Sequence, residues 1–163
     1  MFQKINLTLP EIDLDILKGP RSTPKEVTEF IEYSIWNVNY LIEIFQGKIE
    51  FGIMPDMANV TEIPGKNYPH RDEWTTALNC YINASSDITT FFKFKEGCFV
   101  DQLLYIPEEK LDIVGTFIPQ TGDCYLLNTN NPHTVTTDNP KTILRLIWKT
   151  TVFEDVLKNI RIL

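Results

Sequence analysis

The sequence predicts a mainly β protein, built as a β-sandwich or jelly-roll barrel of two packed antiparallel sheets. Two observations predict this fold class: the chain after Gly47 consists of short apolar or alternating runs, and clusters of turn-forming residues separate the runs. The predicted strands are 48–54, 59–63, 76–83, 88–94, 102–106, 113–118, 124–128 and 142–151. A barrel of this kind has a mouth in which a ligand can bind.

The segment before Gly47 predicts a helix. Thr23 is placed to cap its start, Glu26 follows three residues later, and Pro24 suits the first turn. Gly47 is expected to stop the helix. The stretch 36–40 also alternates as a strand would, so the extent of the helix past Trp36 stays open. Apolar residues recur at helical spacing at Val27, Phe30, Ile31, Ile35, Val38 and Ile42.

Length and composition predict one folded domain, 1–163, with an N-terminal segment at 1–47 and a β core at 48–152. Hydrophobic residues make up 43% of the chain, and no apolar run is long enough to cross a membrane. The N-terminus does not resemble a secretory signal, and three cysteines at unpatterned spacing favour reduced thiols. We therefore expect a cytoplasmic location.

The charge of the chain narrows the class of partner. The net charge is −7, and no cluster of lysines or arginines interrupts it. This disfavours nucleic-acid binding but not a local basic pocket for a small anion. The expected partner is a small molecule or a peptide, with no membrane and an unknown oligomeric state.

The two histidines of the chain predict a metal site. His70 and Asp72 are two positions apart, and on an extended segment such residues point to the same side. His133 follows about sixty residues later, after Asn-Asn-Pro. Two imidazoles and one carboxylate on one face of a metal leave three positions open, which is typical of non-haem Fe(II) oxygenases. Taken alone, an H-x-D on a loop is also typical of a solvated turn.

Arg145 is an unexpected charge inside the apolar run 143–148. A buried guanidinium without a partner is costly, so this arginine indicates an anion beside it. A dicarboxylic co-substrate that chelates the metal and pairs with Arg145 fits both features. The alternative is a structural carboxylate, such as Asp123 or Asp138.

These residues resemble the 2-oxoglutarate- and Fe(II)-dependent dioxygenases over roughly 60–149. EIPGKNYPHRDEW and LNCYIN resemble segments of the prolyl-hydroxylase type, and GDCYLLNTNNPHTVTTDNPKTILRLIW resembles the closing half of the aspartyl/asparaginyl hydroxylase type. The chain departs from both subgroups: it lacks the Gly-Gly-Glu-Thr of the first and has an Asp ligand that the second often lacks. The resemblance therefore leaves the substrate open.

The resemblance implies a double-stranded β-helix, a cupin-like jelly roll. It assigns His70, Asp72 and His133 to iron, Arg145 to the C5 carboxylate of 2-oxoglutarate, and Tyr81 to a supporting hydroxyl. The implied reaction uses O₂, converts 2-oxoglutarate to succinate and CO₂, and hydroxylates a C–H bond of the substrate. Asn79, one alternation from Tyr81, would share its face. From the residues alone, Tyr81 is equally a core side chain.

Two other functions remain open. One is a cupin-like metalloenzyme that uses the same ligands without 2-oxoglutarate. The other is a jelly-roll binding module that has no metal and no catalytic activity.

Overall fold

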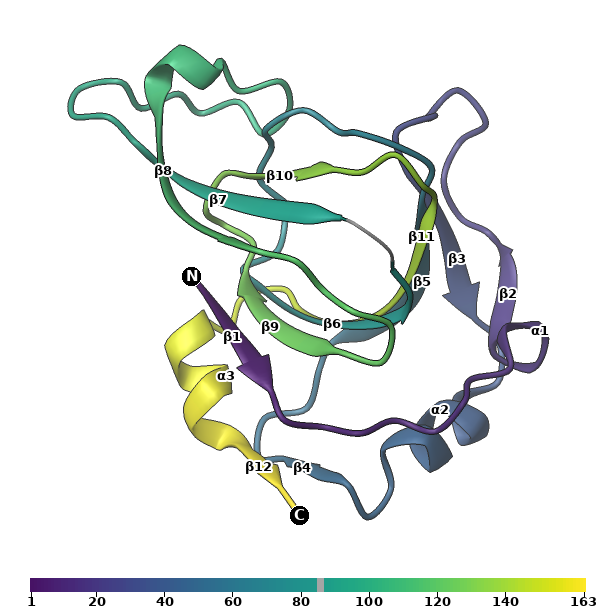
Figure 1. The fold of residues 1–163 in the computed structure, drawn as a ribbon. Helices are drawn as coiled ribbons and strands as arrows, with labels where there is room; N and C mark the ends of the chain where they lie inside the picture. The colour runs from purple at the N-terminus through teal and green to yellow at the C-terminus, as the bar shows by residue number, and fades with distance from the viewer. Residues whose placement is uncertain (85–86) are drawn as a thin grey trace.

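The computed structural model describes residues 1–84 and 87–163, and it confirms a mainly β fold of two antiparallel sheets that face each other (Figure 1). The large sheet has the order β1-β9-β6-β11-β5-β3-β2, and the small sheet has the order β10-β7-β8. A separate pair, β12-β4, joins the C-terminus to the segment after α2. The strands are β1 (Phe2–Ile5), β2 (Lys18–Arg21), β3 (Ile31–Ile35), β4 (Ile49–Phe51), β5 (Met57–Ile63), β6 (Thr76–Asn83), β7 (Ile88–Phe94), β8 (Leu111–Phe117), β9 (Cys124–Asn128), β10 (His133–Thr136), β11 (Lys141–Trp148) and β12 (Ile160–Ile162).

The predicted N-terminal helix is wrong over most of its length. The described helices are short: α1 (Leu14–Leu17), α2 (Val38–Phe45), α3 (Phe153–Asn159) and the 3₁₀ turn η1 (Glu108–Lys110). The cap of α2 is Asn37, whose Oδ1 accepts the Tyr40 N–H at 3.0 Å. The Thr23 hydroxyl instead accepts the backbone N–H of Glu32 at 3.2 Å, and residues 31–35 form β3 against β5. The predicted stop is confirmed, since Gly47 follows α2 with φ +70.

The predicted strands after Gly47 are confirmed except for 102–106, which forms bends. That segment is held by another loop: the Arg71 N–H donates to Leu103 O at 2.7 Å, and the Ile106 N–H donates to Pro69 O at 2.9 Å. The Arg71 guanidinium also donates to three carbonyls of residues 100–102. Segment 100–106 therefore braces the chain on both sides of His70.

Two hydrophobic cores lie on opposite faces of the large sheet, and β11 contributes to both by alternation. Leu144, Leu146 and Trp148 pack on the outer face with α2 and α3, which lie outside the barrel (Figure 1). Ile143 packs in the inner core, between the two sheets. Lys141 and Arg145, which alternate with Ile143 and Ile147 on β11, are cationic and buried. The barrel interior is therefore part apolar and part charged.

Within the described residues, no helix is both long and apolar enough to span a membrane. All three cysteines are free, as expected.

Candidate metal centre

A short backbone bridge brings the two histidines together. The His70 N–H donates to His133 O at 3.0 Å, and the His133 N–H donates to His70 O at 2.9 Å. This pairing extends β10 onto the loop before β6, so the two imidazole centroids lie 4.3 Å apart. The Asp72 N–H donates to Thr129 O at 3.0 Å, which fixes the carboxylate beside them. Residues distant in sequence thus meet through main-chain bonds that hold the loop.

The three predicted ligand side chains converge. Their ligand atoms all lie within 4.8 Å of one another. The Nε2 of His70 is 3.8 Å from Asp72 Oδ1, and the Nε2 of His133 is 4.0 Å from Asp72 Oδ2. Both separations are too long for hydrogen bonds, so neither imidazole is hydrogen-bonded to the carboxylate.

Each imidazole is oriented by its other nitrogen. The Nδ1 of His70 lies 2.8 Å from Tyr68 O, and the Nδ1 of His133 lies 3.0 Å from Asn131 O. A carbonyl only accepts, so in the neutral ring Nδ1 carries the hydrogen and Nε2 keeps its lone pair. This backbone support of the second nitrogen is usual for metal-binding histidines.

The chemistry of the donor set fits a divalent cation. Asp72 Oδ2 is buried and has no hydrogen-bond partner among the described residues. Burial, together with the neighbouring His70, lowers the pKa of His133 to about 4, so its imidazole is neutral at pH 7. A neutral nitrogen and an unsatisfied carboxylate oxygen are the states that a metal requires. His133 also stacks on Phe91, with centroids 5.3 Å apart.

A cavity of about 640 Å³ opens in front of this centre. His70 and Asp72 line it, together with Arg145, Trp74 and Glu32. The cavity is therefore lined both by two candidate metal ligands and by Arg145, the buried cation noted in the sequence. We call it the metal cavity.

Arg145 is buried, and its partner is a residue that the sequence prediction missed. Its Nη1 lies 3.8 Å from Glu32 Oε1, and its guanidinium lies 5.9 Å from the centre of the Trp74 ring. Its Nε is buried and has no hydrogen-bond partner within the described chain. Of the two carboxylates that the sequence suggests, Asp123 pairs instead with Lys4 at 2.7 Å. Burial raises the pKa of Glu32, and the charge of Arg145 opposes that shift.

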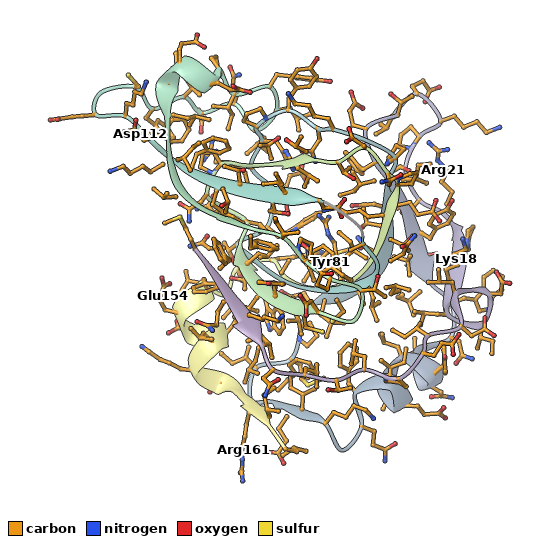
Figure 2. All side chains as sticks on the ribbon, viewed as in Figure 1. Lys18, Arg21, Tyr81, Asp112, Glu154 and Arg161 are labelled. Carbon is orange, nitrogen blue, oxygen red and sulfur yellow. The ribbon has the colours of Figure 1, made fainter. Side chains whose placement is uncertain are left out.

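Tyr81 is buried inside the barrel (Figure 2), on β6, where Asn79 two positions earlier is the register partner of Arg145 on β11. The centre of its ring is 5.2 Å from Lys141 Nζ, and burial raises the pKa of its hydroxyl. Asn79 and Thr89, on β6 and β7, lie close enough to that hydroxyl to oppose this rise in its pKa. Asn79 therefore lies beside Tyr81, as alternation predicts.

A second buried ion pair accompanies Tyr81. Lys141 Nζ lies 3.8 Å from Asp87 Oδ2, and burial lowers the pKa of Lys141 to about 8. Lys141 Nζ and both Asp87 oxygens have no hydrogen-bond partner among the described residues. The sequence prediction missed Lys141. Its spacing of four residues from Arg145 could have identified it, because residues at that spacing on a strand face the same side.

The sequence matches no family model and no curated relative. Among solved structures, ycfD of E. coli is 14% identical with a TM-score of 0.48, over 86% of this chain and 40% of that chain. Hydroquinone 1,2-dioxygenase from Sphingomonas sp. TTNP3 is 11% identical with a TM-score of 0.43, over 68% of each chain. A point mutant of Bacillus subtilis oxalate decarboxylase OxdC is 16% identical with a TM-score of 0.42, over 79% of this chain and 28% of that chain. This chain spans less than half the length of ycfD and of the decarboxylase, and likeness at this distance assigns no activity.

Proposed function

We propose that this protein is an Fe(II)- and 2-oxoglutarate-dependent dioxygenase that hydroxylates a small-molecule or peptide substrate and releases succinate and CO₂. One observation carries the proposal: the three candidate ligand atoms lie within 4.8 Å of one another, and two of the residues that bear them, His70 and Asp72, line a cavity that a buried arginine also lines. This combination suits a metal-chelating diacid, because one end of the diacid binds the metal and the carboxylate at the other end pairs with the guanidinium.

His70, Asp72 and His133 would hold the iron, which when bound supplies the activation of O₂. The chain contributes position and charge. Two neutral imidazoles and one carboxylate carry a single negative charge, so a dication held there keeps a net positive charge that attracts an anionic co-substrate. The backbone carbonyls on each Nδ1 keep both Nε2 atoms directed at a common point.

Arg145 would hold the distal carboxylate of the co-substrate. Its partner, Glu32, engages only Nη1, and at 3.8 Å this contact is longer than a hydrogen bond. Nε, buried without a partner among the described residues, remains a donor for an incoming carboxylate. A charge-assisted hydrogen bond is worth about 1.5–3 kcal/mol, so removing Arg145 should weaken 2-oxoglutarate binding at least tenfold, on the order of one such bond.

Lys141 is the second candidate for this carboxylate. It lies beside Tyr81, the residue that the family resemblance associates with the same carboxylate, and its Nζ has no hydrogen-bond partner in the described chain. Arg145→Ala and Lys141→Ala therefore form a matched pair. The variant that loses 2-oxoglutarate affinity while keeping metal affinity identifies the anchor.

The test of the function is direct. Protein purified without chelator and loaded anaerobically with Fe(II) should, on exposure to O₂, consume it and convert 2-oxoglutarate to succinate. His70→Ala and Asp72→Ala should abolish this turnover. Asp112→Ala is the control and should keep the turnover, because Asp112 is an exposed carboxylate on β8 that lines neither cavity (Figure 2). If the iron-loaded protein neither binds nor decarboxylates 2-oxoglutarate, the proposal fails.

One observation favours a second function, a cupin-like metalloenzyme that does not use 2-oxoglutarate. Glu32 already supplies Arg145 with a carboxylate, so the arginine is satisfied in part without any co-substrate. For such an enzyme, metal would bind but 2-oxoglutarate would not, with or without Arg145→Ala. A non-catalytic module would bind no metal at all, which metal analysis of the reloaded protein decides.

A further inference from the structure

A second cavity, of about 350 Å³, adjoins the metal cavity at His70. We call it the mouth cavity and define it by Glu26, Glu29, Tyr68, Tyr105 and His70. The two cavities share His70 and several apolar or neutral neighbours, so they adjoin on the two sides of the same side chains. A molecule in the mouth cavity therefore lies next to a candidate metal ligand. The shared neighbours are Val27, Phe30, Asn67 and Leu104.

Two tyrosines form an aromatic wall of the mouth cavity. The rings of Tyr68 and Tyr105 lie 5.4 Å apart at 52°, and both side chains are more than half exposed. Tyr105 is the one non-glycine residue with a positive φ in the described chain, at 56°. An L-residue adopts that conformation at a cost, and here it places a ring at the cavity instead of in the core.

Charge sets the kind of ligand that this cavity accepts. The described residues that line it include two glutamates and no lysine or arginine. The Tyr105 hydroxyl donates to Glu29 Oε1 at 2.8 Å, and this bond lowers the pKa of Glu29, so its carboxylate is ionised at neutral pH. A carboxylate held against aromatic faces attracts an organic cation and repels an anion.

The metal cavity shows the opposite character at its inner end. Arg145 Nε and Asp72 Oδ2 are both buried there, each without a hydrogen-bond partner among the described residues. The inner end therefore fits an anion and a metal, whereas the outer end fits a cation. The lining shared by the two, which includes Phe30 and Leu104, suits an aliphatic chain.

We propose that the mouth cavity binds the cationic end of the substrate, a primary ammonium or a guanidinium on an aliphatic chain. This inference rests on the proposed function, whose substrate class it names. The cation would lie between Glu29 and the Tyr68 and Tyr105 rings. The carbon chain would run along Leu104 and Phe30 toward His70. The net charge of −7 on the whole chain favours the approach of such a ligand.

The test measures binding in the absence of turnover. Protein loaded with Zn(II), which has no redox chemistry, is titrated by calorimetry with N-acetyl-lysine N-methylamide and with the arginine and norleucine counterparts. Norleucine matches the aliphatic chain of lysine without its charge. Free L-lysine is a further arm, which separates a free amino acid from a peptide side chain. Either cationic derivative should bind at least tenfold more tightly than the norleucine derivative.

Variants locate the binding. Glu29→Gln should weaken binding of the cationic derivatives at least fivefold and leave the norleucine derivative unchanged. Glu26→Gln serves as the second variant if the first fails to fold. Glu154→Gln, an exposed α3 carboxylate outside the barrel, is the matched control and should have no effect (Figure 2). Equal binding of lysine and norleucine derivatives, no binding of either, or a cation preference that survives Glu29→Gln overturns the inference.

The outcome is separable from that of the proposed function. Cation binding that depends on Glu29, in a protein that does not decarboxylate 2-oxoglutarate, keeps the mouth cavity and removes the dioxygenase. Decarboxylation without a cation preference keeps the dioxygenase and removes this substrate class.

Discussion

At the residue scale, the candidate ligands are poorly satisfied by the described part of the chain. Asp72 Oδ2 is buried without a hydrogen-bond donor there, and the two Nε2 atoms facing it are also acceptors in the neutral rings. When both rings are neutral, these three acceptors converge without a donor, which destabilises the metal-free protein. Such an arrangement is retained where a cation compensates it.

Asp72→Asn should therefore change stability and metal affinity in opposite directions. The Asn side chain keeps the shape and brings an NH₂ group that can donate to an imidazole Nε2. We expect the metal-free variant to be more stable by about 1–3 kcal/mol, the cost of an unsatisfied buried group. We expect its affinity for divalent metal to fall at least tenfold, on the order of the loss caused by disturbing such a centre. Urea unfolding and metal titration measure the two quantities.

The control for this variant is Asp112→Asn, whose carboxylate is exposed on β8. It should change neither quantity. A lower free energy of unfolding for the metal-free Asp72→Asn protein would contradict the interpretation that this carboxylate is unsatisfied without a cation.

Glu32 gives the second prediction at this scale. Its carboxylate competes for Arg145 with any anion in the metal cavity. Glu32→Gln removes the competing charge and keeps the side-chain volume. If Arg145 is the anchor, 2-oxoglutarate should bind at least threefold more tightly to this variant, as measured by calorimetry on metal-loaded protein. Unchanged or weaker binding would exclude Arg145 as the anchor and direct attention to Lys141.

At the element scale, Asn67 attaches the segment before β6 to β10 through both its side chain and its main chain. Asn67 Oδ1 accepts the Val135 N–H at 2.6 Å, and the Asn67 N–H donates to Val135 O at 3.1 Å. The Thr134 hydroxyl also donates to the Asn67 carbonyl. This cluster continues the pairing of His70 with His133, so it sets the relation between the two imidazoles.

Asn67→Ala should loosen this attachment. The Val135 N–H would lose its acceptor in a buried position, at a cost of about 1–3 kcal/mol in the free energy of unfolding. Metal affinity should fall in parallel, because the two histidines are no longer held in register. Asn67→Asp keeps an acceptor oxygen and should retain most of both. Loss of stability without loss of metal affinity would show that β10 alone positions the centre.

Strands and helices could be predicted where residues close together in the sequence define them. β6, β7 and β9 match the predicted limits, since each is a short apolar run between turn residues. The sequence predicts helix at β3 because Phe30 and Ile35 fall at helical spacing, although in the structure Phe30 packs on the inner core and Ile35 on the outer core. Only the pairing with β5 resolves this ambiguity, and that pairing is not encoded locally.

The candidate site was predictable for a different reason. His70, Asp72 and His133 are distinctive residue types in a distinctive order, so a resemblance could place them without any knowledge of the fold. The resemblance also placed Arg145, but it could not place Glu32 or Lys141. Glu32 lies on a strand where the sequence predicts helix, and Lys141 is one lysine among many until its burial is known.

At the scale of the whole molecule, the outer apolar core and the buried charges of the candidate site lie on opposite faces of the large sheet. The outer core, with α2 and α3, is almost entirely apolar, and it buries large side chains such as Trp148 and Phe153. A fully buried side chain of this size contributes about 1.5–3 kcal/mol. This outer core compensates for an interior that carries two ion pairs, Arg145 with Glu32 and Lys141 with Asp87.

Burial of Lys141 makes the free energy of unfolding of the whole chain depend on pH in the alkaline range. Burial lowers the pKa of Lys141 from 10.5 to about 8 in the folded protein. Well below pH 8 both the folded and the unfolded chain hold this proton, and well above 10.5 neither does. Between these values only the unfolded chain holds it, so unfolding takes up a proton and the free energy of unfolding rises with pH.

We expect this rise to be about 2 kcal/mol between pH 8 and pH 10, since one pKa unit corresponds to about 1.4 kcal/mol. The reference is the double variant Lys141→Met/Asp87→Asn, which removes both charges at similar volume and leaves every other titrating group in place. Urea unfolding at pH 8, 9 and 10 gives the slope for each protein. The original chain should gain stability relative to the double variant across this range. Equal pH slopes in the two proteins would mean that Lys141 keeps its proton inside the barrel. A loss of stability relative to the double variant as the pH rises would mean that the ion pair stabilises the fold.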